Sequence, residues 1–433
     1  MDYPYSKVAG IDVHSQIHVV TVMDHKGSRT TQQFYNSLAS LAALRDWIVS
    51  EGCEVVAFES TGDYWRPLYE TLSPFVDVIV AHPRDIKKKY SGKKTDKIDS
   101  EWIAYLTLHN MVPRSRIPSG KELEMRILTR ERESLTNQRT GHQNKVNHIL
   151  VRNGINLKKF VSKPFGKAGV SLIKLISTYG SVDKIIEHLP KKLRKHEERI
   201  SSCLPTGLSV NDRLILQAEL HQIDSLNNSI ASIESRITSV SRKFKREISL
   251  LTTVPGIGYI TAWTIIGEVG IVKDFVKAAN LASWAGLTPW VNQSAGKMRM
   301  GNITKRGSTH LRRVLIQAAH AAARSGNNYM RVFFERVKKH SSYKKAIIAL
   351  ARKILTIAWN VLIRDEPYND DKARGIQKKP SSKSQRNNNS QILSVMMHIE
   401  FLRKLEKSQN LKEMKDTFGT ARQPVYDPDY RFS

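Results

Sequence analysis

Four carboxylates stand at positions where they could bind a divalent cation. Asp96 and Asp99 lie three residues apart in KTDKIDSEW, and on a helix that spacing places both on one face, one turn apart. Asp12 in VAGIDVH and Glu59 in EVVAFES each lie near the end of an apolar, strand-like run. Hard divalent cations bind carboxylate oxygens, and two such ions about 4 Å apart can activate a nucleophile and stabilise a leaving oxygen at phosphorus. The four acids together favour a metal site that acts on nucleic acid phosphate.

Each acid also has a simpler explanation. Asp12 could bond a turn at the end of its strand, and Glu59 could be a surface residue before the helix start STGD. Thr95 or Asp96 followed by an acid three residues later resembles a capping box, which needs no chemistry. An acid within an apolar strand is costly unless it is paired or bound to a metal, so the four acids taken together favour the metal site.

The segments that must position these acids have an α/β pattern. Residues 7–35 alternate as three consecutive antiparallel strands, and residues 36–50 show helical spacing with Ser37 as a candidate cap. A strand at CEVVAFE, a helix at TGDYWRPLYETL, a strand at VDVIVAHP and a helix from about Asp96 to Asn110 follow. We predict an α/β domain with a mixed sheet over residues 1–112.

Residues 113–246 are predicted to form a helical, coiled-coil region. The helix expected over 121–154 carries basic residues that could track a phosphate backbone, namely Arg130, Arg132, Arg139, Lys145 and Arg152. Between residues 211 and 245 apolar residues follow heptad spacing, at Leu216, Leu220, Ile223, Leu226, Ile230, Ile233, Ile237 and Val240. Sustained heptads predict a coiled-coil seam, within the chain or between subunits.

Residues 247–365 are predicted to form a third, mainly helical domain. Gly256 and Gly258 in PGIG could let backbone N–H groups approach a DNA phosphate, as in helix-hairpin-helix elements, or could form an ordinary turn between packed helices. WVNQSAGKMRMGNITKRGS is predicted to be a polar loop. Its Ser294 alone is typical of a loop serine, since a hydroxyl needs a base, cations or a metal to become a nucleophile. Candidate phosphate contacts in and after this loop are Lys297, Arg299, Lys305, Arg306, Arg312 and Arg313.

Composition indicates a polyanionic partner. The 433 residues carry a formal net charge of +29, and Lys and Arg displace counterions from phosphates. The two cysteines, Cys53 and Cys203, form no disulfide framework or zinc-ligand cluster, which favours a reducing, cytoplasmic compartment. We expect no membrane association, because we find no signal peptide and no apolar run of about 18 residues. Residues 366–433 are predicted to be a flexible basic tail, because the segment DEPYNDDKARGIQKKPSSKSQRNNNSQ is low in apolar residues. ILSVMMHIEFLRKLEKSQNLKEM could form one short helix within the tail.

Several segments, in this order, resemble the DEDD transposases of insertion sequences, which are related to the Piv DNA invertases. They are AGIDVH, FESTGDYW, KTDKIDSEWIA, TVPGIG and LASWAGLTP…QSAGK…GNITKRGSTHLRRVL. The resemblance covers roughly residues 6–364 and leaves out the tail. It implies a ribonuclease-H-like N-terminal domain of the RuvC type, a helical coiled-coil insert and a C-terminal transposase domain.

The resemblance also assigns chemistry to residues. The positions that match the catalytic, Mg²⁺-binding (or Mn²⁺-binding) tetrad of the family are Asp12, Glu59, Asp96 and Asp99. Ser294 matches a serine nucleophile that forms a covalent phosphoserine link to cleaved DNA. Family members often read SSG or SSGG there, whereas this chain reads QSAG.

The same resemblance implies the partners. Members are similar in acting on double-stranded donor and target DNA, which a structured noncoding RNA selects. They assemble as dimers and tetramers, with the tetrad of one subunit meeting the serine of another. We therefore expect an RNA-guided DNA transposase in a prokaryotic cytoplasm, associated with the nucleoid when it acts.

Two other functions are compatible with the residues. A RuvC-like structure-specific endonuclease would hydrolyse DNA with water and would need no serine. A non-catalytic nucleic-acid-binding protein would need none of the four acids. A covalent protein–DNA adduct distinguishes the recombinase from the endonuclease, and function after replacement of all four acids would favour the binding protein.

Overall fold

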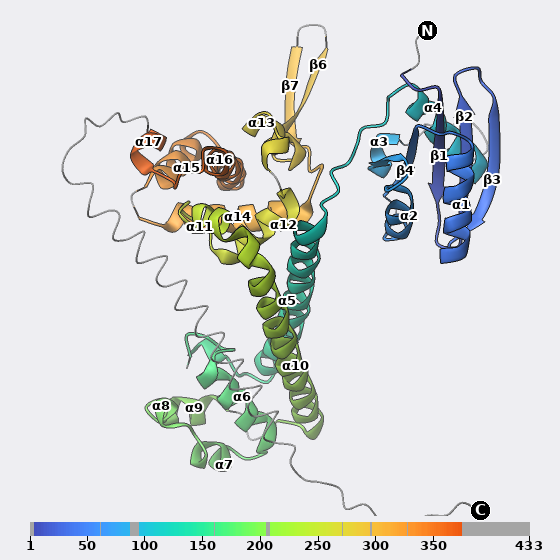
Figure 1. The fold of residues 1–433 in the computed structure, drawn as a ribbon. Helices are drawn as coiled ribbons and strands as arrows, with labels where there is room; N and C mark the ends of the chain where they lie inside the picture. Colours follow the sequence, from blue (N-terminus) through green and yellow to red (C-terminus); the bar gives the residue numbers. More distant parts are fainter. Residues whose placement is uncertain are drawn as a thin grey trace, which may run out of the picture. The chain divides into compact units, whose positions relative to one another are not determined.

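The computed structural model describes residues 4–60, 62–86, 95–159, 161–204, 208–270, 272–294, 297–326 and 328–374 (Figure 1). The chain forms two compact units, Met1–Ile117 and Pro118–Ser433. The tail predicted beyond residue 365 is described only as far as residue 374. The short helix expected within that tail lies outside the described residues.

The first unit is built on a five-stranded mixed sheet. Its strands are β1 (Lys7–Val13), β2 (Ile17–Asp24), β3 (Arg29–Tyr35), β4 (Val55–Glu59) and β5 (Asp77–Ala81). They lie in the order β3-β2-β1-β4-β5. β1, β2 and β3 pair in antiparallel fashion, and β4 and β5 run parallel to β1. The predicted three-strand start and the mixed sheet are therefore confirmed.

Helices cover both faces of this sheet (Figure 1). α1 (Leu38–Ser50) and α2 (Trp65–Leu72) share a buried core with Ile11 and Val13 of β1. α4 (Asp96–Leu108) shares a second core with Val8 of β1, and a short helix, α3 (Pro83–Ile86), precedes it. Successive side chains of a strand point to opposite faces. Asp12 therefore belongs to the face that α4 covers.

The second unit contains two long antiparallel helices, α5 (Gly120–Arg152) and α10 (Val210–Ser241), which lie side by side (Figure 1). Arg132 pairs with Glu234 at 2.7 Å, and Arg152 pairs with Asp212, so the helices run in opposite directions. Smaller helices connect them: η1 (Leu157–Lys159), α6 (Lys167–Thr178), α7 (Val182–Glu187), α8 (Lys191–Arg194) and α9 (Glu197–Cys203).

The heptad residues of α10 pack within this chain. Leu216 and Ile223 share a buried cluster with Leu150 of α5 and Ile173 of α6. Ile237 belongs to another cluster, which includes Met125 of α5. These apolar residues with heptad spacing thus pack α10 against α5 and α6.

The C-terminal part of this unit is helical around one core. Its elements are η2 (Arg242–Phe244), α11 (Lys245–Thr252), α12 (Tyr259–Val269), η3 (Val272–Asp274), α13 (Ala278–Trp284), β6 (Pro289–Ser294), β7 (Lys297–Ile303), α14 (Thr309–Arg324), α15 (Tyr329–Lys339), α16 (Tyr343–Arg364) and α17 (Asp370–Arg374). The prediction that WVNQSAGKMRMGNITKRGS forms a polar loop is wrong, because β6 and β7 in this segment pair as an antiparallel hairpin. KMRMGNI alternates with a period of two, which is a strand pattern that the polar residues and glycines concealed. The sequence analysis also assigned no helix to α15.

α16 corrects the expectation that the chain has no membrane-length apolar helix. By length and composition this helix could cross a membrane, with a mean hydropathy of 1.8 over its most apolar window. Yet Leu350, Ile354 and Leu355 are fully buried in the core that α16 shares with α12 and α14. Packing within the protein therefore accounts for its apolar residues.

An ion pair with a buried carboxylate joins α5 to α12. Glu268 is 1% exposed, and Arg130 donates to both of its carboxylate oxygens at 2.6 and 2.9 Å. Arg126 donates to the backbone oxygens of Gly267 and Glu268. Burial raises the pKa of Glu268, but the hydrogen bond from Arg130 and the charges of Arg130 and Arg126 outweigh burial and hold that pKa below its ordinary value. The pair therefore stabilises the fold while Glu268 is ionised.

Replacing Glu268 tests this account. Glu268→Gln should lower the free energy of unfolding at neutral pH by about 2 kcal/mol, because Arg130 loses a charge-assisted partner. A carboxyl whose pKa is depressed on folding contributes stability above its ordinary pKa of 4.5 and loses it as the pH falls through the folded value. The difference between the variant and the wild type should therefore shrink below pH 4.5 in urea unfolding curves.

The control is the exposed pair of Arg246 with Asp365. Asp365 has a φ of 53°, which asparagine also tolerates, so Asp365→Asn removes the charge without new backbone strain. It should cost at most about 1 kcal/mol. Equal losses in the two variants would contradict a special role for the pair with the buried carboxylate.

Candidate functional site

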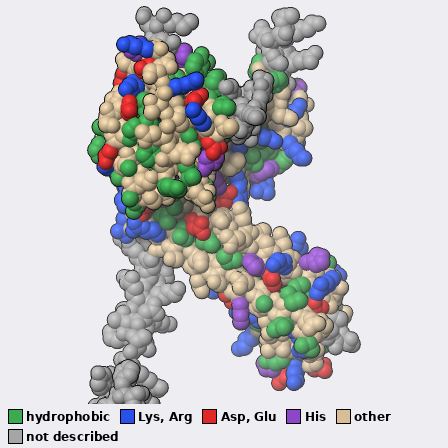
Figure 2. All heavy atoms as spheres, turned by 90° about the vertical axis from the view of Figure 1, so that its right-hand side faces the viewer, with side chains coloured by type: hydrophobic (Ala, Val, Ile, Leu, Met, Phe, Trp, Pro, Cys, Tyr) green, Lys and Arg blue, Asp and Glu red, His purple; other side chains and the backbone are tan. Residues whose placement is uncertain are grey.

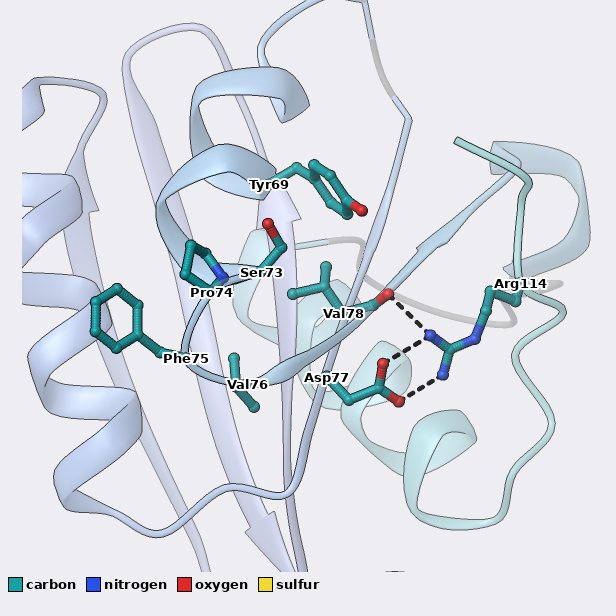
Figure 3. Close-up of a pocket in the computed structure, with 8 residues that line it drawn as sticks. All are labelled: Tyr69, Ser73, Pro74, Phe75, Val76, Asp77, Val78 and Arg114. Atoms are coloured by element: carbon teal, nitrogen blue, oxygen red, sulfur yellow. Dashed lines mark hydrogen bonds and ion pairs between the residues drawn. The ribbon is translucent and has the colours of Figure 1, made fainter. Parts of the chain in front are cut away.

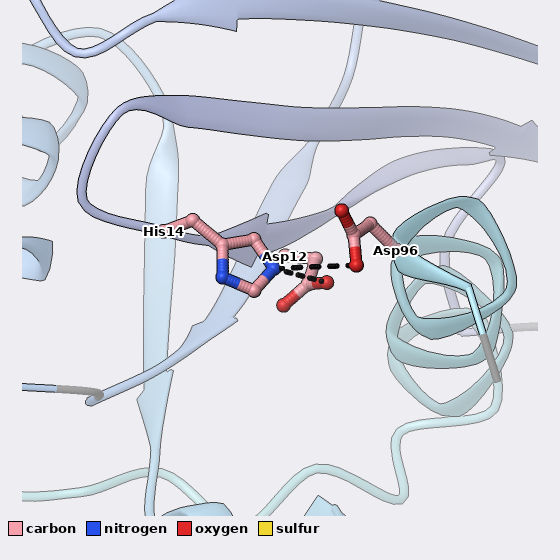
Figure 4. Close-up of side chains that lie close together, drawn as sticks. All are labelled: Asp12, His14 and Asp96. Atoms are coloured by element: carbon pink, nitrogen blue, oxygen red, sulfur yellow. Dashed lines mark hydrogen bonds and ion pairs between the residues drawn. The ribbon is translucent and has the colours of Figure 1, made fainter.

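Three side chains of kinds that can bind a metal converge at the carboxyl end of β1 (Figure 4). His14 Nε2 lies 3.1 Å from Asp12 Oδ2 and 3.5 Å from Asp96 Oδ1. One ligand atom from each of the three residues lies within 4.8 Å of the others. Asp12 is buried, whereas the His14 and Asp96 side chains are 50% and 63% exposed. The cluster therefore has a buried floor and an open rim that a cation or a phosphate could reach.

The close packing of α4 on β1 brings these acids together. A Cβ at Gly10 would lie 2.2 Å from the Ala104 nitrogen and 2.5 Å from the Ser100 oxygen, so only glycine permits this approach of the two backbones. Thr21 lies on β2, the strand next to β1, and its hydroxyl is 2.8 Å from the hydroxyl of Ser100 on α4. Both residues are fully buried. The glycine and the hydroxyl pair fix where α4 begins, and with it the position of Asp96.

The start of α4 does not have the geometry of a capping box. Thr95 is the N-cap, and its hydroxyl accepts a hydrogen bond from the Ile98 backbone nitrogen at 3.3 Å. The acid of a capping box stands three residues after the cap, and that position holds Ile98. Asp96 and Asp99 lie one and four residues after the cap, so Thr95 alone performs the capping that the alternative interpretation gave to the acids.

The charge of Asp99 acts on Asp12. Burial raises the pKa of Asp12, the neighbouring His14 lowers it, and the charges of Asp99 and Asp96 raise it. The net effect is a pKa above the ordinary value, as expected for a buried carboxyl facing other acids. Such a site disfavours the ionised acid unless a cation compensates its charge.

Glu59 stands on the strand beside Asp12. β1 and β4 pair in parallel with Ile11 opposite Phe58, and Glu59 and Asp12 each follow these residues by one position. Neighbouring strands are about 4.8 Å apart, and alternation places both acids on the face of α4. Glu59 and Asp99 are nevertheless outside the group of described residues whose ligand atoms lie within 4.8 Å of one another.

The sequence analysis did not count His14 among the ligands. The signal was present, since Asp12 and His14 are two positions apart at a strand end and such side chains share a face. The donor set of two carboxylates and one imidazole fits a divalent cation, because both groups are common metal ligands. The residues present are therefore compatible with the metal that the sequence implied.

Ser294 occupies the end of a strand. It is the last residue of β6 and pairs with Lys297, the first residue of β7, across positions 295 and 296. Arg299 pairs with Asn292 farther down the hairpin. The serine predicted to lie in a loop is thus the last residue of a strand in a two-stranded hairpin.

Most basic residues predicted to contact phosphates on α5 are paired inside the second unit. Arg130 binds Glu268, Arg132 binds Glu234, and Lys145 lies 3.4 Å from Glu219. Arg139 donates to Asn227. These contacts give the four residues a structural role, and their binding of nucleic acid stays a prediction.

The candidates near the hairpin differ in exposure. Arg312 is buried and donates to the backbone oxygens of residues 285, 306 and 307, and Arg313 pairs with Glu133 at 2.5 Å. Lys305 and Arg306 are exposed. The two exposed residues are therefore the better placed of these four to meet a phosphate.

The PGIG turn has one glycine with a packing requirement. Gly256 has a φ of 92°, and a Cβ there would lie 2.3 Å from the Ala318 oxygen of α14. Gly258 precedes α12, and a Cβ there would meet nothing within 4 Å. Gly256 is thus explained by helix packing, while the surroundings of Gly258 leave room for an approaching phosphate.

Positive charge is spread over the surface. Figure 2 shows Lys and Arg side chains dispersed over the face that is drawn, with Asp and Glu among them. This distribution suits a partner that follows an extended path over the protein more than one held in a single small pocket.

The first unit also has a surface hollow, of about 410 Å³, between α2 and β5 (Figure 3). Arg114 closes one side of it through two hydrogen bonds to Asp77, at 2.7 and 2.5 Å. The hydrogen bond from Arg114 lowers the pKa of Asp77. Asp77 begins β5, whereas Asp12 lies near the end of the parallel strand β1. The hollow is thus at the opposite end of the sheet from the carboxylate cluster.

Sequence comparisons match this chain to transposases and to a pilin gene-inverting protein. A family described as "Transposase", of the DEDD and IS110 type, matches residues 9–153, and the "Transposase IS116/IS110/IS902 family" matches residues 248–335. The chain is 23% identical over 378 residues to the transposase for insertion sequence element IS1111A of Coxiella burnetii, covering 84% of this chain and 91% of that protein. It is 25% identical over 364 residues to a probable family 20 transposase of Pseudomonas aeruginosa, covering 83% and 97%. It is 30% identical over 147 residues to the pilin gene-inverting protein of Moraxella bovis, covering 33% and 46%.

The packing at Gly10 can be tested by adding one methyl group. Gly10→Ala should force α4 away from β1, lower the free energy of unfolding by about 2 kcal/mol and weaken Mn²⁺ binding, because Asp96 moves with the helix. Thermal unfolding and calorimetric titration with Mn²⁺ measure the two effects. Gly141→Ala is the control, since a Cβ at this helical glycine meets nothing within 4 Å. Wild-type stability and Mn²⁺ affinity in Gly10→Ala would show that the contact does not position the site.

Proposed function

The chain belongs to the DEDD transposase family of insertion sequences, a family of DNA-recombining enzymes, and we propose that it cuts and rejoins DNA through a serine–DNA intermediate. The observation that carries this proposal is the convergence of Asp12, His14 and Asp96 at one end of the sheet. Glu59 and Asp99, on adjacent elements, complete the proposed tetrad. The ribonuclease-H-like domain of this family thus supplies the metal-binding half of the chemistry.

The acids and the serine have different roles in this proposal. Asp12, Glu59, Asp96 and Asp99 would hold Mg²⁺ or Mn²⁺, and such an ion would supply positive charge next to the reacting phosphate. The Ser294 hydroxyl gives its proton to water, and its oxygen forms an ester bond to a DNA phosphorus. The bond from phosphorus to a sugar oxygen breaks, and that oxygen takes a proton back from water, so that no proton is gained or lost overall. Because the phosphate remains in an ester bond to Ser294, a DNA hydroxyl can later displace the serine and reseal a strand.

The proposal includes a noncoding guide RNA, donor and target DNA, and a homo-oligomer in a bacterial cytoplasm. The net charge of +29 supports two polyanionic partners. Exposed Lys305 and Arg306, close after the hairpin that carries Ser294, are candidates to contact phosphates there. Lys297 and Arg299 lie on β7 of the same hairpin. These contacts would hold the DNA backbone without reading its sequence.

The covalent intermediate provides the test. The wild type incubated with substrate DNA and Mg²⁺ should yield a protein–DNA adduct that survives denaturing electrophoresis. Ser294→Ala and Asp12→Ala should each remove the adduct, because one lacks the nucleophile and the other a metal ligand. Both should retain DNA binding in a gel-shift assay.

Ser229→Ala is the matched control, since Ser229 is an exposed serine on α10. It should form adduct at the wild-type level. An undiminished adduct in Ser294→Ala would refute the assignment of the nucleophile. Cleaved DNA without any adduct in the wild type would instead favour the hydrolytic endonuclease.

A further inference from the structure

The third donor of the cluster is an imidazole rather than a carboxylate. We propose that His14 Nε2 is a direct metal ligand, which makes this a mixed nitrogen–oxygen site that favours Mn²⁺ and similar transition-metal cations over Mg²⁺. The inference rests on the proposed function, because it takes the carboxylate cluster as the metal site of the recombinase. It adds His14 to the four acids as a metal ligand, and it adds a preference for Mn²⁺ over Mg²⁺.

The spacing of the donor atoms supports direct ligation. Two ligands at neighbouring corners of an octahedron, each about 2.1 Å from the ion, are separated by about 3 Å. His14 Nε2 lies 3.1 Å from Asp12 Oδ2 and 3.5 Å from Asp96 Oδ1. His14 Nε2 therefore lies at about the distance from each carboxylate oxygen that is expected when all three atoms bind one ion. Asp12 comes from β1 and Asp96 from α4.

The backbone explains why His14 reaches the cluster. Val13 ends β1 and is 1% exposed on the face of α1 and α2. Asp12 and His14 flank it, so both turn toward the side of α4. His14 therefore reaches the cluster from just after the end of β1, whereas Asp96 reaches it from the first turn of α4 (Figure 4).

The chemistry of imidazole gives the preference. First-row transition metals accept imidazole nitrogen, and Mn²⁺ does so least strongly among them, whereas Mg²⁺ favours oxygen donors and keeps several of its waters. A site with one histidine among carboxylates should therefore gain more affinity for Mn²⁺ than for Mg²⁺. The competing account is that His14, when protonated, only forms ion pairs with Asp12 and Asp96 and leaves when a cation binds.

Mn²⁺ binding to the full-length chain separates these accounts. Electron paramagnetic resonance of free Mn²⁺ gives the affinity, and pulsed measurements detect ¹⁴N nuclei bonded to the ion. The wild type should show the ¹⁴N signal. His14→Ala should lose the signal and bind Mn²⁺ about 10-fold more weakly, with a smaller change for Mg²⁺ measured by competition. His14→Asp should bind both ions but lower the ratio of Mn²⁺ to Mg²⁺ affinity, and it keeps the test open if the alanine variant folds poorly.

His25→Ala is the control, because this histidine lies beyond the other end of β1 and bonds the Ser6 backbone. It should keep the ¹⁴N signal and the wild-type affinity. A wild type without the ¹⁴N signal, or His14→Ala with unchanged Mn²⁺ affinity, would overturn the inference and leave a carboxylate-only site. Mn²⁺ binding that persists in the double variant Asp12→Asn, Asp96→Asn would instead contradict the metal site on which the proposed function rests.

Discussion

The contact between β1 and the backbone of α4 at Gly10 positions the side chains of the proposed metal site. Strand and helix approach so closely that a methyl group would overlap the Ala104 nitrogen. Metal ligands must be placed within about 0.5 Å, and rigid elements do this better than loops. Asp12 is fixed by strand pairing and Asp96 by the first turn of a helix that cannot slide. Packing of β1 against α4 thus positions both proposed ligands.

Electrostatics adds a second constraint. Within a chain of net charge +29, the carboxyl end of β1 gathers acids around the buried Asp12. Burial and the neighbouring acids disfavour ionisation of Asp12, which His14 partly offsets. A divalent cation would relieve the same repulsion. In the second unit, by contrast, basic side chains form ion pairs with acids of the same unit. Arg132 pairs with Glu234 and Arg130 with Glu268, which joins α5 to α10 and to α12. The excess positive charge is therefore partly structural.

The sequence predicted those features that depend on local periodicity. Alternation marked β1, β2 and β3, and heptads marked the buried stripe of α10. The hairpin of β6 and β7 was missed because both strands contain polar residues and β7 contains a glycine, which concealed the period-two alternation of its methionines. Gly10 and Ser100 could not be identified as contacts, since their meeting depends on a packing between residues about ninety positions apart in the chain. His14 was overlooked although it stands two positions after Asp12, because only the structure shows that it also lies beside Asp96.

An anomalous difference map from crystals of the full-length chain grown with Mn²⁺ tests the central claim most directly. The account predicts a Mn²⁺ peak at the carboxyl end of β1, bonded to oxygens of Asp12 and Asp96. Mn²⁺ bound elsewhere in the chain, with no peak beside Asp12, would contradict it.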